Sequence, residues 1–257
     1  MNYENEILRC MTMVEKLNIE LDTFLISKDK EIEKNKKKKI KKQIKKCKKL
    51  LVSEQSKIVA YKNPLDLYNE SFFAERKKIN SWMYKWEEKM GEFLVGEYSL
   101  NSVVDFGCGT AHSLLGAYNM GAKVFGYDIA FSSVKKFIPK EIVNFVLYGD
   151  VTDTILCEIC NCAISIETAE HIFPNKSENF VKNLCSSADK IIIITAAALE
   201  QTGIGHINCR SKSFWIDLFR SMNWKYSLKE TDKIKLKCTE WKSPDWIINN
   251  LMFFIPN

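Results

Sequence analysis

Residues 103–112 read VVDFGCGTAH, and this stretch decides the fold. An apolar run ends in Asp105, and two glycines, Gly107 and Gly109, follow it one residue apart. Glycine has no Cβ and tolerates positive φ, so a loop built on this pair lets its backbone approach a ligand closely. The stretch therefore predicts a buried strand followed by a loop of the kind that holds nucleotide-type ligands with backbone groups.

From residue 102 onward, strand-like runs alternate with helix-like segments. The five strand-like runs span residues 102–107, 122–129, 144–150, 162–168 and 190–197. Such alternation is typical of a parallel sheet covered by helices. Two further runs, 224–232 and 249–256, have no clear helix between them, and we expect them to pair antiparallel at one edge. The predicted fold class is α/β, with a seven-stranded, mostly parallel sheet, an antiparallel edge strand and an N-terminal helical extension.

The extension is predicted to cover residues 1–60, and the main domain residues 61–257. In the extension, apolar residues recur at three- and four-residue steps along two stretches, which predicts two amphipathic helices. The first stripe consists of Ile7, Met11, Val14, Leu17, Leu21 and Phe24, and the second of Ile40, Ile44, Cys47 and Leu51. The two helices are expected either to pair as a hairpin or to pack on the main domain.

The positive charge of the chain, +6 in total, is concentrated in the extension. Residues 28–49 contain thirteen lysines and three acidic residues, a local net charge of +10, so the rest of the chain is slightly negative. A contact with a phosphate backbone needs dense positive charge, which predicts nucleic acid contact through residues 28–49. The alternative is a solvated helix face, because no aromatic residue lies among the lysines to stack on bases.

Three features of the sequence bear on where the protein acts. No run of about 18 uncharged apolar residues occurs, so no membrane span is expected. The nine cysteines are spread along the chain, and the first residues lack the basic-then-apolar layout of a secretion signal. A cytoplasmic location, where thiols stay reduced, is therefore expected.

Three aspartates stand at the ends of three successive predicted strands: Asp105, Asp128 and Asp150. In a doubly wound sheet, ligands bind outside the carboxyl ends of the strands, near the point where the strand order reverses. Asp128 follows Gly107 by 21 residues, which places its carboxylate to accept both hydroxyls of a ribose. Two features argue against a dinucleotide ligand. The third glycine of the dinucleotide fingerprint is replaced by His112. The carboxylate of Asp105, two residues before Gly107, would repel a pyrophosphate but attract a cationic ligand.

Together, VVDFGCGT, GYDIA and YGDVT resemble the class I S-adenosylmethionine-dependent methyltransferases, which have a Rossmann-like fold and use a sulfonium cofactor. The resemblance runs from about residue 75 to the end and implies a role for each matching position. Asp105, Gly107 and Gly109 would hold the methionine part of S-adenosylmethionine, Asp128 the ribose hydroxyls and Asp150 the exocyclic amine of adenine, with Val151 beside the ring. Ala111 stands where the family usually has another glycine.

A second group of candidate residues follows the fourth predicted strand. Glu167, Glu170 and His171 stand at i, i+3 and i+4, so in a helical turn their side chains would share one face. Two carboxylates and an imidazole at this spacing suit Mg²⁺, Mn²⁺ or Zn²⁺, and His206, after the fifth strand, would supply a further imidazole. Without a metal, His171 or His206 is the natural general base, and Glu167 contacts cofactor or substrate.

The arrangement resembles the metal site of the small-RNA 3′-terminal 2′-O-methyltransferases, which pair a Glu-x-x-Glu-His element with a distant histidine. The element is also similar to that of ubiquinone-pathway O-methyltransferases, so it does not by itself specify RNA. The resemblance implies methylation of a hydroxyl, either on RNA or on a sugar or other small molecule. The hypothesis from another class is a non-catalytic, methyltransferase-like scaffold whose basic helices mediate assembly.

Overall fold

The computed structural model describes residues 11–14, 16–17, 30–155 and 157–257. Three residues of the first predicted helix, Ile7, Leu21 and Phe24, lie outside the described residues, as do positions 28–29 of the lysine stretch.

The chain divides into two compact units, and each is described by itself. The first consists of Met1–Leu67 and the short segment Thr202–His206. The second consists of Tyr68–Gln201 and Ile207–Asn257. The predicted domain division at residue 60 stays a prediction.

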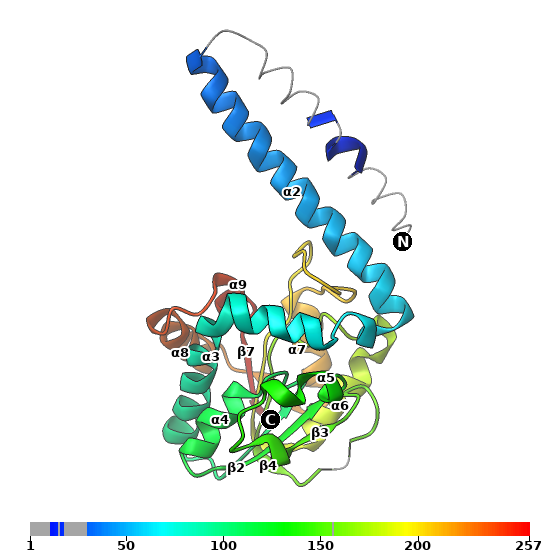
Figure 1. Cartoon of the computed structure of the whole chain (residues 1–257). Coiled ribbons are helices and arrows are strands. Elements are labelled where there is room, and N and C mark those ends of the chain that lie inside the picture. The colour runs from blue at the N-terminus through cyan, green and yellow to red at the C-terminus, as the bar shows by residue number, and fades with distance from the viewer. Residues whose placement is uncertain (1–10, 15, 18–29, 156) are drawn as a thin grey trace. The chain divides into compact units, whose positions relative to one another are not determined.

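The second unit contains one seven-stranded sheet (Figure 1). Its strands are β1 (Ser102–Phe106), β2 (Lys123–Asp128), β3 (Val146–Tyr148), β4 (Cys160–Ser165), β5 (Ala188–Ile194), β6 (Trp224–Tyr226) and β7 (Met252–Pro256). Their order is β3-β2-β1-β4-β5-β7-β6, with β1 to β5 parallel and β7 antiparallel to both β5 and β6. The predicted fold class is confirmed, with the antiparallel strand one position in from the edge. The strand order reverses between β1 and β4, which is where such sheets bind ligands.

Helices cover both faces of this sheet, because alternate residues of a buried strand point to opposite sides. The helices of the second unit are α3 (Glu70–Tyr98), α4 (His112–Asn119), α5 (Phe131–Val134), α6 (Ser177–Ser186), α7 (Lys212–Ser221), α8 (Leu228–Glu240) and α9 (Asp245–Asn250), with 3-10 turns at Lys135–Phe137, Val143–Phe145 and Pro174–Lys176. Val103 and Ile193 pack into one core with α3, α4, α8 and α9. Their neighbours Val104 and Ile192 pack into a second core with α6 and α7.

The prediction that no helix separates the last two strands is wrong. Only Trp224–Tyr226 of the expected strand pair with β7, and the chain then enters α8 and α9. Ser227 is the N-cap of α8, because its hydroxyl accepts a hydrogen bond from the N–H of Glu230 at 3.4 Å. Ile234 and Cys238 are buried one helical turn apart, and the charged residues around them obscure this short apolar stripe.

The first unit is built on α2 (Lys30–Lys62), an unbroken helix of 33 residues that the 3-10 turn η1 (Pro64–Asp66) follows. The buried Ile40, Ile44 and Cys47 of α2 pack with Val14 and Leu17 of the preceding segment. The two predicted apolar stripes therefore meet each other, as the hairpin alternative requires. None of the helices in the described parts of the chain is both long and apolar enough to cross a membrane.

Candidate cofactor-binding and catalytic site

The loop after β1 places two glycines in the left-handed region. Gly107 has φ +78° and Gly109 has φ +51°, conformations that favour glycine. A Cβ at Gly107 would collide with the side chain of Thr168, so the loop packs directly against the segment that follows β4. A Cβ at Gly109 would meet nothing within 4 Å. The backbone at Gly109 therefore faces open space, where a ligand has room to approach.

Ala111, the N-cap of α4, lies in the same left-handed region at φ +59°. This conformation costs a residue with a Cβ about 1–2 kcal/mol. Glycine is therefore favoured at this position. Alanine, which occupies it here, has the smallest side chain of the residues that carry a Cβ.

Asp105 is buried in β1 with one of its carboxylate oxygens unsatisfied. Its side chain is 3% exposed, and Oδ2 accepts a hydrogen bond from the Ser113 hydroxyl at 2.7 Å. Oδ1 has no hydrogen-bond partner among the residues that the structure describes. Burial, with a smaller contribution from the nearby Asp128 carboxylate, raises the pKa of Asp105 to about 7. A cationic ligand would both satisfy Oδ1 and favour the ionised form.

Asp128 ends β2 and is fixed by two backbone groups. The N–H of Gly109 donates to Oδ2 of Asp128 at 2.8 Å, and the N–H of Ala130 donates to Oδ1 at 2.7 Å. Burial of the side chain, which is 8% exposed, raises the pKa of Asp128, and these two hydrogen bonds oppose that rise. A carboxylate has about four acceptor positions, so this one retains capacity for the hydroxyls of a ligand.

Asp150 follows β3 in a local turn. Its Oδ1 accepts hydrogen bonds from both the N–H and the hydroxyl of Thr152, each at 2.8 Å. This turn fixes the half-buried carboxylate beside the end of the strand. The next residue, Val151, is buried, and the side-chain amide of Asn183 donates to its carbonyl oxygen at 2.8 Å.

The structure brings the three predicted aspartates to one edge of the sheet, since β1, β2 and β3 are adjacent and parallel. The register of β1 and β2 pairs Asp105 with Gly126, two residues before Asp128. Asp150 is linked to them through Gly149, whose N–H donates to the carbonyl oxygen of Asp128 at 3.3 Å.

Glu167 follows β4, and the helical turn that would put Glu167, Glu170 and His171 on one face does not begin there. Glu167 has φ +53°, and the turn instead joins the N–H of His171 to the carbonyl oxygen of Thr168 at 2.9 Å. The N–H of Glu167 donates to Oγ1 of Thr195 at 2.7 Å, and the side-chain amide of Asn250 donates to Oε1 of Glu167 at 3.4 Å. These contacts hold Glu167 at the carboxyl edge of the sheet, where burial raises its pKa.

Glu170 is the most deeply buried acid of the candidate site, with 0% of its side chain exposed. Neither Oε1 nor Oε2 has a hydrogen-bond partner within the described part of the chain. Burial and the neighbouring Glu167 carboxylate raise the pKa of Glu170 well above its ordinary value. Such a side chain stays neutral unless a cation compensates its charge.

His171 is oriented by Tyr68, which precedes α3. Nδ1 of His171 lies 2.8 Å from the phenolic oxygen of Tyr68, and the two rings meet edge to face with their centroids 5.5 Å apart. Burial and the Glu170 carboxylate raise the pKa of Tyr68, so its hydroxyl stays protonated. Tyr68 is not among the residues predicted from the sequence. Its only signal is its position before the helix N-cap Asn69, where an apolar residue commonly packs on the first turn.

His206 is the last residue of the segment Thr202–His206, which belongs to the first unit. It is covalently joined to Ile207, whose N–H donates to the carbonyl oxygen of Glu170 at 2.9 Å. Asn208 donates to the same carbonyl oxygen, also at 2.9 Å. Ile207 and Asn208 therefore anchor the segment that directly follows His206 to the backbone of Glu170.

His112, the remaining histidine, joins α3 to α4. Its ring stacks on Tyr84 with centroids 4.0 Å apart, and its Nδ1 lies 2.7 Å from Oε1 of Glu88. Burial lowers the pKa of His112. Where the dinucleotide fingerprint has its third glycine, this chain therefore has a side chain that holds two helices together.

The strand order and the helices on both faces of the sheet make this a Rossmann-like fold, and solved S-adenosylmethionine-dependent methyltransferases share it. No protein-family model and no curated protein matches this chain. Solved structures do match it. Magnesium protoporphyrin IX methyltransferase from Synechocystis PCC 6803, solved with S-adenosylmethionine, is 14% identical over 75% of this chain and 94% of its own, with a TM-score of 0.55.

Two further solved structures have the same fold. CalS10, an amino pentose methyltransferase from Micromonospora echinaspora solved with S-adenosylmethionine, is 10% identical over 72% of this chain and 95% of its own, with a TM-score of 0.52. DesVI from Streptomyces venezuelae is 9% identical over 67% of this chain and 93% of its own, with a TM-score of 0.52. At these identities the likeness establishes the fold alone.

Proposed function

We propose that this protein is an S-adenosylmethionine-dependent methyltransferase that methylates a hydroxyl. The observation that carries the proposal is the unpaired Oδ1 of Asp105, buried on the strand that leads to the open space at Gly109. Leaving a buried acceptor without a partner costs about 1–3 kcal/mol. The ammonium group of the cofactor's methionine part would satisfy this oxygen, whereas a pyrophosphate would be repelled by it.

The other cofactor contacts follow from the same edge of the sheet. In the proposal, Gly107 and Gly109 let the backbone approach the methionine part, and Asp128 accepts hydrogen bonds from the ribose hydroxyls. Asp150 accepts from the exocyclic amine of adenine, and the buried Val151 packs beside the ring. The fixed carboxylate of Asp128 and the turn at Asp150 support these roles, because both groups are held in place by backbone or local hydrogen bonds.

In the proposed reaction, the acceptor oxygen attacks the methyl carbon of the sulfonium. The O–CH₃ bond forms as the S–CH₃ bond breaks, the hydroxyl proton passes to a base, and neutral S-adenosylhomocysteine leaves. We assign the base to His171 or His206, with Glu167 beside the acceptor. His171 suits this role when its Nδ1–H donates to the oxygen of Tyr68, because Nε2 then keeps its lone pair.

We further propose that Glu167, Glu170, His171 and His206 hold a divalent metal such as Mg²⁺. The unpaired Oε atoms of Glu170 support this, because a cation would compensate a carboxylate that is otherwise costly to ionise. A bound metal would lower the pKa of the acceptor hydroxyl. Without a metal, the same residues act as the base and its neighbours.

Titration calorimetry with S-adenosylmethionine tests the first step of the proposal. Binding heat is expected from the folded protein, and loss of that heat is expected for Asp105→Ala. A folded protein that gives no heat at any concentration would favour the scaffold hypothesis. Transfer of labelled methyl groups into a fractionated extract then identifies the acceptor, and label found only on nitrogen or carbon would contradict O-methylation.

Different observations support two classes of methyl acceptor, a small molecule and RNA. The solved neighbours include enzymes named for magnesium protoporphyrin IX and for an amino pentose, which favours a small-molecule acceptor. The lysine face of α2 favours RNA instead. We define this face as Lys38, Lys39, Lys41, Lys42, Lys45, Lys46, Lys48 and Lys49, all of which are exposed. The labelled fraction in the extract experiment separates the two acceptor classes.

The geometry of the lysine face fits a phosphate backbone. At about 1.5 Å of rise per residue, these eight lysines occupy roughly 18 Å of helix, or about one charge per 2 Å. A nucleic acid duplex carries one charge per about 1.7 Å, a similar density. The opposite, apolar side of α2 is covered by Val14 and Leu17, so α2 does not offer an apolar stripe for insertion into a membrane.

A further inference from the structure

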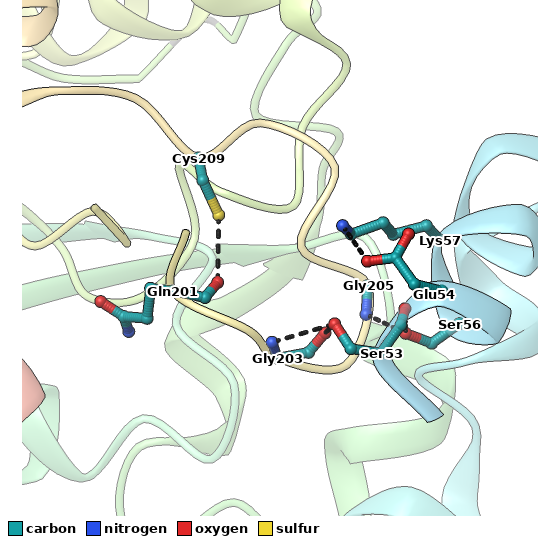
Figure 2. Close-up of polar contacts among 8 residues, drawn as sticks. All are labelled: Ser53, Glu54, Ser56, Lys57, Gln201, Gly203, Gly205 and Cys209. Atoms are coloured by element: carbon teal, nitrogen blue, oxygen red, sulfur yellow. Dashed lines mark hydrogen bonds and ion pairs between the residues drawn. The ribbon is translucent and has the colours of Figure 1, made fainter. Parts of the chain in front are cut away.

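Two serine hydroxyls of α2 fasten the loop that carries His206. The hydroxyl of Ser53 donates to the carbonyl oxygen of Gly203 at 2.9 Å and accepts from the N–H of the same residue at 3.3 Å (Figure 2). The hydroxyl of Ser56 accepts from the N–H of Gly205 at 2.8 Å. The loop Thr202–His206 is therefore bonded to α2 on both sides of its exposed tip, Ile204.

These hydrogen bonds are unusual for serines inside a helix. Such a hydroxyl commonly donates back to a carbonyl oxygen of its own helix, as Ser56 does to Ser53 at 2.7 Å. The Ser53 hydroxyl instead bonds to both backbone groups of Gly203, although the two residues are 150 positions apart. Ser53 is 2% exposed and Ser56 is 6% exposed, so water does not readily replace these contacts.

The neighbouring turn of α2 is itself held in place. The buried Glu54 accepts from the ammonium group of Lys57 at 2.6 Å, one helical turn away (Figure 2). Ser53 and Ser56 therefore stand on a helical turn that carries a further side-chain contact. Such a support transmits its position to the loop, because helices hold side chains more rigidly than loops do.

His206 lies directly against the glycine that Ser53 holds. A Cβ at Gly203 would collide with Nε2, Cδ2 and Cε1 of the His206 ring, so the imidazole packs on the bare backbone at Gly203. Gly203 does not have positive φ, so the need for glycine here is one of space alone. Gly205, which directly precedes His206, has φ +70° and is held by Ser56.

We propose that Ser53 and Ser56 are positioning residues that set the orientation of the His206 imidazole through the backbone of Gly203 and Gly205. The proposal rests on the proposed function, in which His206 is a base or a metal ligand.

The test uses the full chain and the histidine ring signals in nuclear magnetic resonance spectra. The chain has three histidines, so ring-labelled protein gives three sets of signals, and His206→Gln assigns that of His206. In Ser53→Ala, Ser56→Ala and Gly203→Ala, the His206 signals should move and broaden while those of His112 stay. Gln55→Ala, at an exposed position of the same helix, is the matched control and should leave all three sets unchanged.

The same variants are then assayed for methyl transfer. A misplaced imidazole should lower kcat by about 10-fold to 100-fold, with KM for S-adenosylmethionine unchanged. Ser53→Thr retains the hydroxyl and should restore most of the rate that Ser53→Ala loses. Gly203→Ala disturbs the ring from the other side, so it tests the proposal even if a serine variant fails to fold.

The outcomes separate this proposal from the proposed function. His206 signals that stay unchanged in the Ser53→Ala, Ser56→Ala double variant and in Gly203→Ala would overturn the positioning role. Signals that move in a protein whose wild type binds no S-adenosylmethionine would support the positioning role and overturn the methyltransferase proposal.

Discussion

The phenolic oxygen of Tyr68 lies 2.8 Å from Nδ1 of His171. The contact joins Tyr68, two residues before α3, to the turn after β4. Because it uses Nδ1 of His171, the other ring nitrogen, Nε2, points away from Tyr68. Burial and the Glu170 carboxylate raise the pKa of Tyr68, so its hydroxyl stays protonated and can donate to or accept from the imidazole. Partners of this kind orient a histidine that acts as a ligand or a base.

Replacing Tyr68 with phenylalanine should therefore reduce activity without unfolding the protein. The ring and its packing on Phe72 are retained, but the constraint on His171 is removed. We expect kcat to fall by about 10-fold to 100-fold, as for other groups that orient a histidine. Tyr118→Phe, at an exposed position on α4, is the control. An unchanged kcat in Tyr68→Phe would show that His171 needs no support from Tyr68.

Cofactor affinity should rise with pH, because the ammonium group of S-adenosylmethionine pairs with ionised Asp105. The pKa of Asp105 is about 7 in the free protein, so about pH 6 leaves most of this carboxyl protonated. Calorimetry should show about a 10-fold weaker affinity at about pH 6 than at about pH 8, with release of a proton on binding. Asp105→Asn should bind weakly with no such pH dependence. The exposed Asp153→Asn should behave like the wild type.

The Asp105 carboxyl should affect protein stability in the opposite direction: as pH rises, cofactor affinity increases but the stability of the cofactor-free protein decreases. Folding raises the pKa of Asp105 from its ordinary value of 3.8 to about 7, so the folded protein holds a proton that the unfolded chain releases. The free energy of unfolding of the cofactor-free protein should therefore fall as pH rises from about 4 to about 7. Denaturant titrations across this range should show a smaller fall in Asp105→Asn. An equal fall in both proteins would place the titrating group elsewhere.

Glu170→Gln should separate a metal site from a buried neutral acid. Without metal, glutamine closely replaces the protonated carboxyl, so we expect Tm at low pH to change little. Because the pKa of Glu170 is raised, the wild type should lose stability as pH rises, and the variant should lose less. Mg²⁺ or Mn²⁺ should raise the Tm of the wild type and of the exposed control Glu178→Gln, but not that of Glu170→Gln. An equal metal-induced shift in Glu170→Gln would contradict the metal proposal.

Glutamine substitutions on the lysine face should weaken RNA binding and flatten its salt dependence. The slope of log K against log salt concentration is negative, and for each phosphate that a lysine no longer neutralises its magnitude should fall by about 0.7 to 0.9. Lys41, Lys42 and Lys45 are suitable positions, and Lys225 and Lys229 on the second unit are exposed controls. Binding that these three substitutions leave intact would contradict the nucleic acid proposal, as would a preference for anionic vesicles over RNA.

Local patterns in the sequence were enough to predict the sheet and the residues at its carboxyl edge. Asp105, Asp128 and Asp150 directly follow apolar runs, and strand periodicity determines where such runs end. The hydrogen bond from the N–H of Gly109 to Asp128 could not be predicted, because it depends on the left-handed turn at Gly109. The same limit applies to Glu167, whose positive φ removes it from the expected helical turn.

Contacts between distant segments could not be predicted from such patterns. Tyr68 meets His171 across 103 residues, and no local spacing indicates that pairing. The helix α8 was also missed, but its start could have been predicted from the sequence, because Ser227 followed three residues later by Glu230 is a pattern typical of a helix N-terminus. There the charged residues of the segment outweighed a short apolar stripe.

Ser53 and Gly203 are made at well separated times during biosynthesis. A ribosome adds about 5–20 residues per second, so roughly 8 to 30 s pass between the emergence of Ser53 and that of its partner. The unit that is encoded first is therefore complete only after the strands from β1 to β5 have been made. A nascent chain that stalls before residue 202 would present the two serines of α2 without their partners, a state that a chaperone or protease could distinguish from the complete protein.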